Sequence, residues 1–199
     1  DRIAVPAVKV SNQALMLQIA AEQAFGEGNA FKLDPLTVSM AHPDALAALL
    51  SGTSEITAHF TWDPFHAREL RQPGVRTILS SVDVLGGPAT TIAIVAPSQF
   101  REANPRTFNA FIAAFDEATA LINRDKRAAA EAYVQITREK NETVDAIARS
   151  LADANNEFTL TPQNTIRYAA FMHKTGNIKA RPASWRDMFF PEMHKRPGS

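Results

Sequence analysis

The sequence of 199 residues contains no cysteine and no excess of either charge. Without cysteine there is no disulfide, no thiolate metal ligand and no cysteine nucleophile. Lysine and arginine together number 21, and aspartate and glutamate also number 21, so the formal net charge is zero. A balanced charge gives no support for a nucleic-acid partner or a membrane-surface partner, and we expect no nucleic acid to bind.

Long apolar runs and common catalytic motifs are also missing. No apolar run approaches the roughly 18 residues that span a bilayer, and the start lacks the pattern of a signal peptide. Because the chain opens directly on a strand-like segment, we expect that its natural beginning has been removed. The sequence has no glycine-rich phosphate loop, no Gly-x-Ser-x-Gly elbow and no His-Glu-x-x-His. We therefore expect neither an enzyme nor a cofactor.

The first ninety residues alternate short β-branched segments with amphipathic ones. Ser11 is a favourable N-cap for a helix, and Gly26 is placed to end it. Alternating strands and helices indicate a parallel sheet with right-handed crossovers, and therefore an α/β fold. The expected strands are Ile3–Pro6, Leu36–Met40, Glu55–Thr61 and Val75–Leu79, and the expected helices are Asn12–Phe25, Pro43–Leu50 and Pro64–Leu70.

Beyond Gly86-Gly87-Pro88 the pattern changes to one strand followed by helices. Thr90–Ala96 is nearly apolar throughout, which is typical of a fully buried strand. Asn104 and Pro105 have the pattern of a helix start. The further helices are expected at Lys126–Thr137, Thr143–Leu151 and Pro162–Lys174. These helices carry more apolar surface than they would bury on each other, and we expect a second sheet to cover it.

Ligands of open parallel sheets bind beyond the carboxyl ends of the strands. The segment Lys9–Gln13 lies in such a loop and leads into a helix, where free N–H groups and the helix dipole favour an anion. An ordinary capped helix is the competing interpretation.

The stretch AHFTWDPFH, from Ala58 to His66, allows a metal site or a strand that ends in a turn. A strand directs His59 to the face opposite Trp62, and His66 falls on the next helix, so the ligands of a metal would not converge. We therefore expect no metal site, and Asp63 is interpreted as the N-cap of the helix. Trp62 either forms the wall of a ligand pocket or packs under a neighbouring helix, and both interpretations stay open.

The order of several motifs resembles one family closely. IAVP opens the chain, WDPF follows a strand at 62–65, and GGPATTIAIVAPSQFREANPRTFNAFIAAFDEA covers 86–118. PASWRDMF at 182–189 is similar to the closing helix of the same family. Together these motifs resemble the nitrate/sulfonate/taurine class of solute-binding proteins of ABC importers. The resemblance extends over nearly the whole chain.

The resemblance implies a periplasmic-binding-protein-like fold of two α/β lobes, with the ligand between them. Residues 1–90 would form the second lobe. Residues 91–199 would form a crossing strand and C-terminal helices of the first lobe, whose own sheet would precede Asp1. Half of the cleft would then be missing from this chain, which would weaken its binding.

The resemblance also implies a ligand, partners and a location. The ligand would be a small anionic molecule such as a sulfonate or nitrate, and the protein partner would be an ABC transporter permease. The protein would be periplasmic, and it would contact a membrane only through the transporter or a lipid anchor. The ligand-facing residues by this analogy are Val10, Ser11, Asn12, Gln13, Thr61, Trp62 and Asp63.

Two other classes of protein remain as alternatives. The first is the effector-binding domain of a transcription regulator, which uses a similar two-lobed fold. The second is an enzyme similar to a pyrimidine-precursor synthase, which would need histidine and metal chemistry. The histidines are widely scattered in the sequence and do not favour it: His42, His59, His66, His173 and His194.

Overall fold

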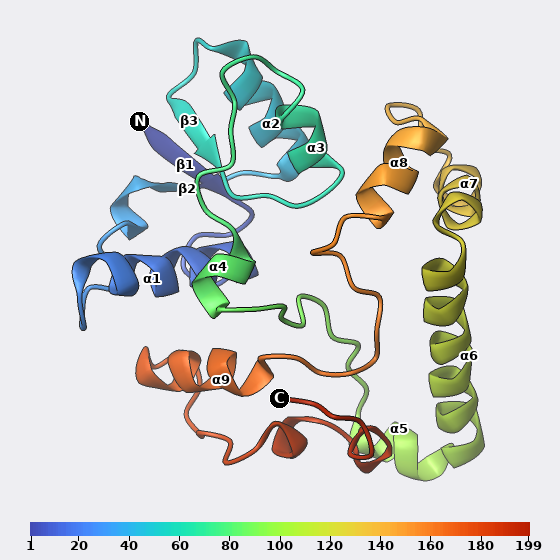
Figure 1. The fold of residues 1–199 in the computed structure, drawn as a ribbon. Coiled ribbons are helices and arrows are strands. Elements are labelled where there is room, and N and C mark those ends of the chain that lie inside the picture. Colours follow the sequence, from blue (N-terminus) through green and yellow to red (C-terminus); the bar gives the residue numbers. More distant parts are fainter. The chain divides into compact units, whose positions relative to one another are not determined.

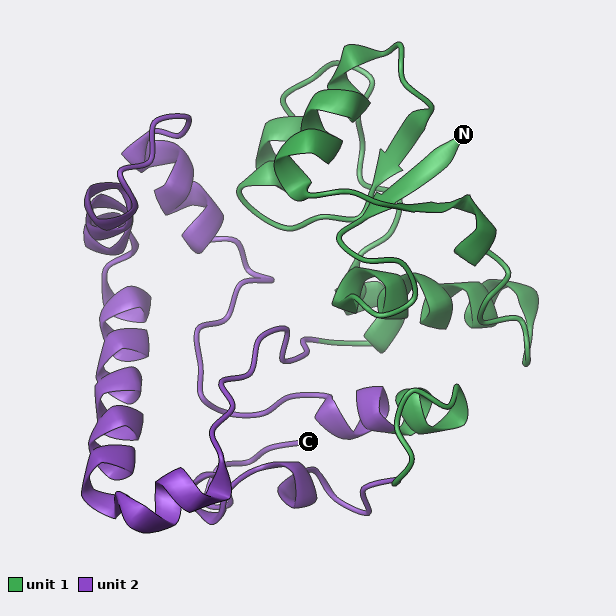
Figure 2. Ribbon diagram, turned by 180° about the vertical axis from the view of Figure 1, so that it is seen from behind, with its two compact units in different colours: residues 1–87, 170–180 green, residues 88–169, 181–199 purple.

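The computed structural model describes residues 1–199 and has an α/β fold with a small parallel sheet. The chain divides into two compact units (Figure 2). Unit 1 comprises residues 1–87 and 170–180, and unit 2 comprises residues 88–169 and 181–199. Unit 1 contains the sheet and is described first.

Unit 1 contains three of the four strands that the alternating pattern predicts, and the helices between and after them (Figure 1). Ser11 accepts a hydrogen bond from the backbone N–H of Ala14 and so begins α1, and Gly26 ends that helix at a φ of 89°. The strands are β1 (Arg2–Val5), β2 (Thr37–Ser39) and β3 (Ile56–His59). The helices are α1 (Asn12–Phe25), α2 (His42–Ser51), α3 (Phe65–Glu69) and α4 (Ser81–Leu85).

The three strands are parallel and lie in the order β2-β1-β3. From β1 the chain crosses to β2 through α1, and from β2 it returns past β1 to β3 through α2. Right-handed crossovers in opposite directions place α1 and α2 on opposite faces of the sheet. The strand order therefore reverses between β1 and β3, and a doubly wound sheet binds its ligands at the carboxyl ends of such a pair.

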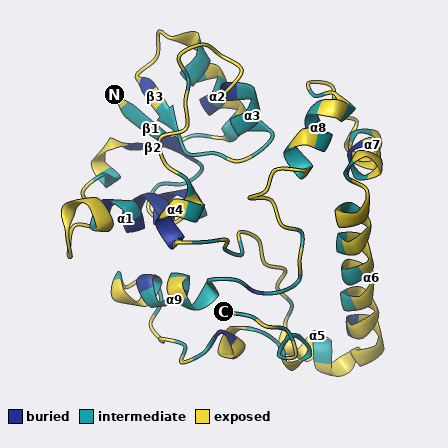
Figure 3. Cartoon of the chain, viewed as in Figure 1, coloured by how far each residue is buried: buried dark blue, intermediate teal, exposed yellow.

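Small and branched side chains form the core under α2. Ala4, Ala45 and Ile56 are buried between the sheet and α2, and Val38 and Leu49 pack against them. Figure 3 shows the buried residues concentrated in the sheet and along α1. The packing of these side chains holds α2 against β1 and β3. Because α2 begins at His42, this packing also fixes the position of His42.

Replacing Ile56 with alanine tests the contribution of this core. Ile56 is 4% exposed, so its loss leaves a cavity, and we expect the free energy of unfolding to fall by about 2–5 kcal/mol. Ile78 lies in the same unit but is 75% exposed, and its replacement with alanine should change the free energy by no more than about 0.5 kcal/mol. Denaturant unfolding measures both. Equal losses of free energy in the two variants would contradict the assignment of Ile56 to the core.

An ion pair ties the later segment of unit 1 to α1. Lys174 Nζ lies 3.0 Å from Glu22 Oε2 and 3.0 Å from Glu27 Oε1. The hydrogen bond from Lys174, helped by the backbone N–H of Gly28, lowers the pKa of Glu22. Both partners are partly exposed to solvent, so we expect this pair to add little stability.

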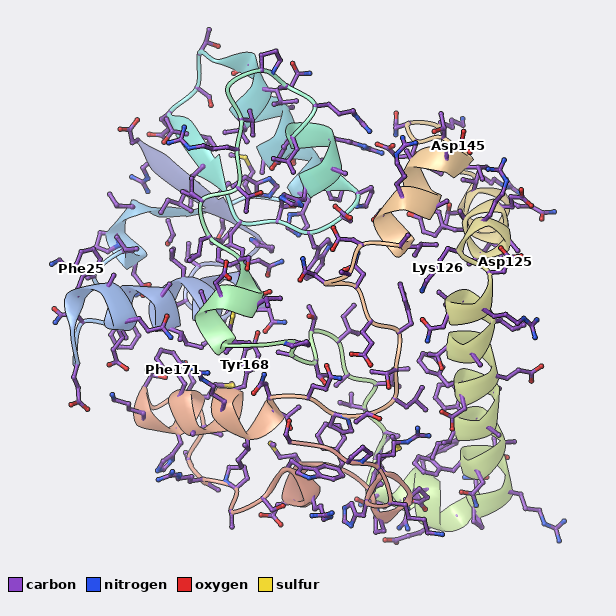
Figure 4. All side chains as sticks on the ribbon, viewed as in Figure 1. Phe25, Asp125, Lys126, Asp145, Tyr168 and Phe171 are labelled. Carbon is purple, nitrogen blue, oxygen red and sulfur yellow. The ribbon has the colours of Figure 1, made fainter.

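Unit 2 is helical. Its helices are α5 (Ser98–Ala103), α6 (Pro105–Arg124), α7 (Lys126–Thr137) and α8 (Val144–Leu151), and α9 (Thr165–Lys174) begins in it. Asp125 accepts from the backbone N–H of Ala128 and so begins α7. Figure 4 labels Asp125 and Lys126 at this end of the helix. Arg127 Nη1 pairs with Asp145 Oδ1 at 2.7 Å, which joins α7 to α8.

Two of the strand predictions are wrong. Residues 75–79 and 90–96 form no strand, and Ile92, Ile94 and Val95 are exposed rather than buried. A strand requires a neighbouring strand to pair its N–H and C=O groups, and the sheet contains only β1, β2 and β3. The apolar composition of 90–96 is typical of a strand, but pairing with a neighbouring strand is a long-range property that the local pattern does not contain.

Two helix starts also differ in detail. Asn104 precedes α6 as expected, but its side-chain amide donates to the carbonyl of Phe100 and does not cap the helix. The last predicted helix begins at Thr165 rather than Pro162, because Asn164 adopts a left-handed conformation with a φ of 52°.

The helices of unit 2 keep part of their apolar surface uncovered. Phe108 is buried, and its ring packs edge-on against Phe190 at 5.3 Å between centroids. Phe111 and Phe115 stack on each other, yet both remain exposed. The expected second sheet over these helices stays a prediction.

Candidate functional site

Polar and aromatic side chains converge at the carboxyl ends of β1 and β3. Gln13 lies in the first turn of α1, after β1, and His42 is the first residue of α2. Thr61 and Trp62 lie in the loop that follows β3. Three loops of the sheet thus bring their side chains to its switch point. We call Gln13, His42, His59, Thr61, Trp62 and Glu69 the His42 cluster.

His42 is the centre of this cluster. Its Nε2 lies 3.5 Å from the side-chain nitrogen of Gln13, which is itself buried. Its ring lies 5.1 Å from that of Trp62 and stacks on Phe65 at 5.3 Å, both between centroids. Trp62 remains 43% exposed, and its indole packs on His42 at the start of α2. The interpretation of Trp62 as the wall of a ligand pocket stays a prediction.

A chain of short hydrogen bonds runs inward from His42. His42 Nδ1 lies 2.9 Å from His59 Nε2, and His59 Nδ1 lies 2.6 Å from Glu69 Oε1. The side chains of His59 and Glu69 are 0% and 5% exposed. The chain therefore begins at a buried carboxylate and ends at a histidine beside Trp62.

The direction of these bonds follows from the groups at the two ends of the chain. His59 Nδ1–H donates to the Glu69 carboxylate, which only accepts. The side-chain nitrogen of Gln13, which only donates, faces His42 Nε2, so His42 donates from Nδ1–H to His59 Nε2. Thr61 Oγ1 lies 3.3 Å from the same His42 nitrogen and 3.3 Å from the carbonyl of Trp62. Its hydroxyl hydrogen is directed at that carbonyl, so Thr61 is also an acceptor for His42 Nδ1–H. Neutral His42 consequently carries its lone pair on Nε2.

Burial lowers the pKa of His42, and the neighbouring His59 lowers it further, while Glu69 acts in the opposite direction. The imidazolium form is thus less favourable in the folded chain than in the unfolded one. Neutral His42, with an accepting Nε2, is the form that the surroundings stabilise near pH 7.

A pH dependence of stability follows from this lowered pKa. Above the ordinary value of 6.5 both states of His42 are neutral. Below it the unfolded chain takes up the proton first, so stability is lost as the pH falls from 6.5 towards the folded pKa. We expect His42→Asn to reduce this loss. Denaturant unfolding between about pH 7.5 and pH 5 measures it, and identical pH profiles for both proteins would contradict the assignment.

The structure brings only some of the residues predicted from the sequence into the His42 cluster. Gln13, Thr61 and Trp62 are brought together around His42. Val10 is 70% exposed and makes no contact in the cluster. Ser11 caps α1, and Asn12 is the first residue of that helix. Asp63 accepts from the backbone N–H of Ala67, but the N-cap position of α3 is Pro64 and the helix begins at Phe65, so the prediction of Asp63 as the N-cap is wrong.

The two histidines of the opening stretch have different surroundings. His66 Nε2 lies 2.8 Å from Thr77 Oγ1, away from His42. His59 was expected on the face opposite Trp62, and the structure joins the two residues only through His42, which contacts both. No group of three His, Asp or Glu side chains is placed to hold one metal ion.

Sequence reasoning missed His42 and Glu69. His42 does follow an expected strand directly, and that position at a carboxyl end was the available signal. The sequence held no comparable signal for Glu69, because its partner His59 lies ten residues earlier on a different element.

A second feature of unit 1 is an open hollow of about 520 Å³ lined by Lys9, Phe31, Asp34 and Pro35. Both carboxylate oxygens of Asp34 already accept from Gln18 at 3.1 Å. The His42 cluster is the stronger candidate, since binding sites are marked by convergent polar groups beside an aromatic wall rather than by volume alone.

Comparisons with known proteins gave no further guide. No protein-family model matches the chain, and no curated protein or solved structure matches it either. The class that the structure defines is therefore an α/β protein with a small parallel sheet and a polar, aromatic cluster at its switch point. None of its helices combines the length and the apolar character needed to span a membrane.

Proposed function

We propose that this protein is the extracytoplasmic solute-binding component of an ABC importer, and that it binds a small ligand without transforming it. The observation that carries the proposal is the meeting of Gln13, His42 and Trp62 at the switch point of a parallel sheet. The sequence motifs that resemble the nitrate/sulfonate/taurine class support the same proposal.

Each part of the site has a role in such binding. The first turn of α1 offers backbone N–H groups and the positive end of a helix dipole to an anionic group. The open part of Trp62 covers a flat or apolar part of the ligand. Exposed apolar residues at 92–95 fit a strand that would pair with a second lobe in such a protein. The partners would be a small anion and a transporter permease.

The histidine chain supports one competing function. A histidine that is hydrogen-bonded through a second histidine to a buried carboxylate can take a proton from a substrate. His42 would then be the general base of an enzyme, in keeping with the synthase-like alternative.

One experiment separates the two functions. We expect calorimetry with sulfonates, nitrate, bicarbonate and aromatic carboxylates to show saturable binding of at least one compound. Chromatography should then recover that compound unchanged after prolonged incubation. Turnover of any compound would refute the transport function, and loss of that turnover in His42→Asn would establish the enzyme.

A further inference from the structure

We propose that His42 Nε2 is the specificity-determining acceptor of the site, which selects a ligand that carries an N–H or O–H donor in addition to its anionic group. This inference rests on the proposed function and specifies its ligand class. Nothing in the sequence motifs distinguishes a ligand with a donor from one without it.

The acceptor role follows from the hydrogen bonds of His42. The side-chain nitrogen of Gln13 only donates and faces His42 Nε2, so the proton of neutral His42 lies on Nδ1, towards His59 Nε2. The only nitrogen left for a ligand is His42 Nε2. Its present neighbour is the amide of Gln13 at 3.5 Å, at the outer limit of a hydrogen bond, so a ligand donor can replace a weak contact with a strong one.

The lone pair of His42 favours a donor over a bare anion at this point. His59 from β3 and Glu69 from α3 are the titratable groups that act on His42, and they act in opposite directions. An anionic oxygen placed directly on Nε2 of neutral His42 would meet a lone pair. A hydroxyl or amino group would meet an acceptor.

Trp62 supplies the geometric part of the selection. Its indole lies against His42 at 5.1 Å between centroids and keeps an open side. A ligand that covers this open side with a flat group places its edge near His42. The class of ligand is therefore a small anion with a planar or apolar body and a donor on its edge.

A matched pair of probes tests the proposal on the 199-residue chain. Benzenesulfonate has the anion and the ring, and 4-hydroxybenzenesulfonate adds one O–H donor that stays protonated at neutral pH, since phenols ionise near about pH 10. We expect the hydroxylated probe to bind about tenfold more tightly at pH 7.5, the equivalent of one hydrogen bond. NMR titration detects weak binding of both probes.

The pH and two variants locate the effect at His42. Protonation of His42 removes the acceptor, so the ratio of the two affinities should fall towards one as the pH drops from about 7.5 to 5. His42→Asn keeps a donor for His59 but lacks an acceptor at the Nε2 position, and it should abolish the preference. His42→Gln places an amide oxygen near that position and should restore part of it.

The outcomes are distinguishable. Equal binding of the two probes at pH 7.5 overturns the donor inference and leaves the solute-binding proposal standing. Binding of neither probe counts against both. Nitrogen-15 NMR of the imidazoles at pH 7.5 tests the inference on the wild-type protein, so it does not depend on whether the variants fold. A lone pair on Nε2 of His42 supports the inference, and a proton on that nitrogen overturns it.

Discussion

Replacing Trp62 with alanine should weaken the binding of an aromatic sulfonate by about 1–3 kcal/mol, the scale for losing one large apolar contact. The indole is 43% exposed in the free protein and is anchored by the ring of His42, so its open side is available to the ligand. Calorimetry of the wild-type and variant proteins with benzenesulfonate measures the difference.

The control for this variant is Phe31→Ala. Phe31 is also a half-exposed aromatic residue of unit 1, but it lines the hollow beside Asp34 rather than the His42 cluster. Its replacement should leave the affinity within about 0.5 kcal/mol of the wild type. If Phe31→Ala weakens binding and Trp62→Ala does not, the ligand occupies the hollow and the site assigned here is wrong.

Replacing His59 with leucine should lower the free energy of unfolding by about 3–5 kcal/mol. The side chain of His59 is fully buried, and it is the hydrogen-bond partner of a Glu69 carboxylate that is only 5% exposed. Without His59 this carboxylate stays buried with no donor to its Oε1 atom, which is far more costly than the loss of an exposed contact. Denaturant unfolding at pH 7.5 gives the value.

A double-mutant cycle shows whether the pair is the cause. With both residues replaced, His59→Leu and Glu69→Leu, no buried carboxylate remains, and much of the stability lost in His59→Leu should return. Additive losses in the double variant would show that His59 acts by packing alone. They would also remove the basis for the proton position assigned to His59.

The sequence predicted the parts of the molecule that depend on local pattern. The helix of residues 12–25, its cap at Ser11 and its end at Gly26 were all correct, because capping and helix termination are decided by neighbouring residues. The parallel arrangement of β1, β2 and β3 followed from their alternation with helices. Gln13, Thr61 and Trp62 could be proposed as site residues because all three follow strand ends.

What could not be predicted depends on contacts between distant residues. Val95 and its neighbours have the composition of a buried strand but are exposed, since no strand of the chain pairs with them. His42 joins Gln13 to Trp62 only because α2 packs across β1 and β3. The role of Glu69 required the fold, since a glutamate on a short helix gives no sign that its carboxylate is buried.

The central claim is that ligand binds at Trp62 and the His42 cluster, and the two tryptophans of the chain provide a direct test. Each indole N–H gives one cross-peak in a proton–nitrogen NMR spectrum, and Trp62→Phe assigns them. During a titration with 4-hydroxybenzenesulfonate, the Trp62 peak should shift in a saturable way, while the peak of Trp185, buried in unit 2, stays in place. A saturable shift of Trp185 with Trp62 unmoved would contradict the claim.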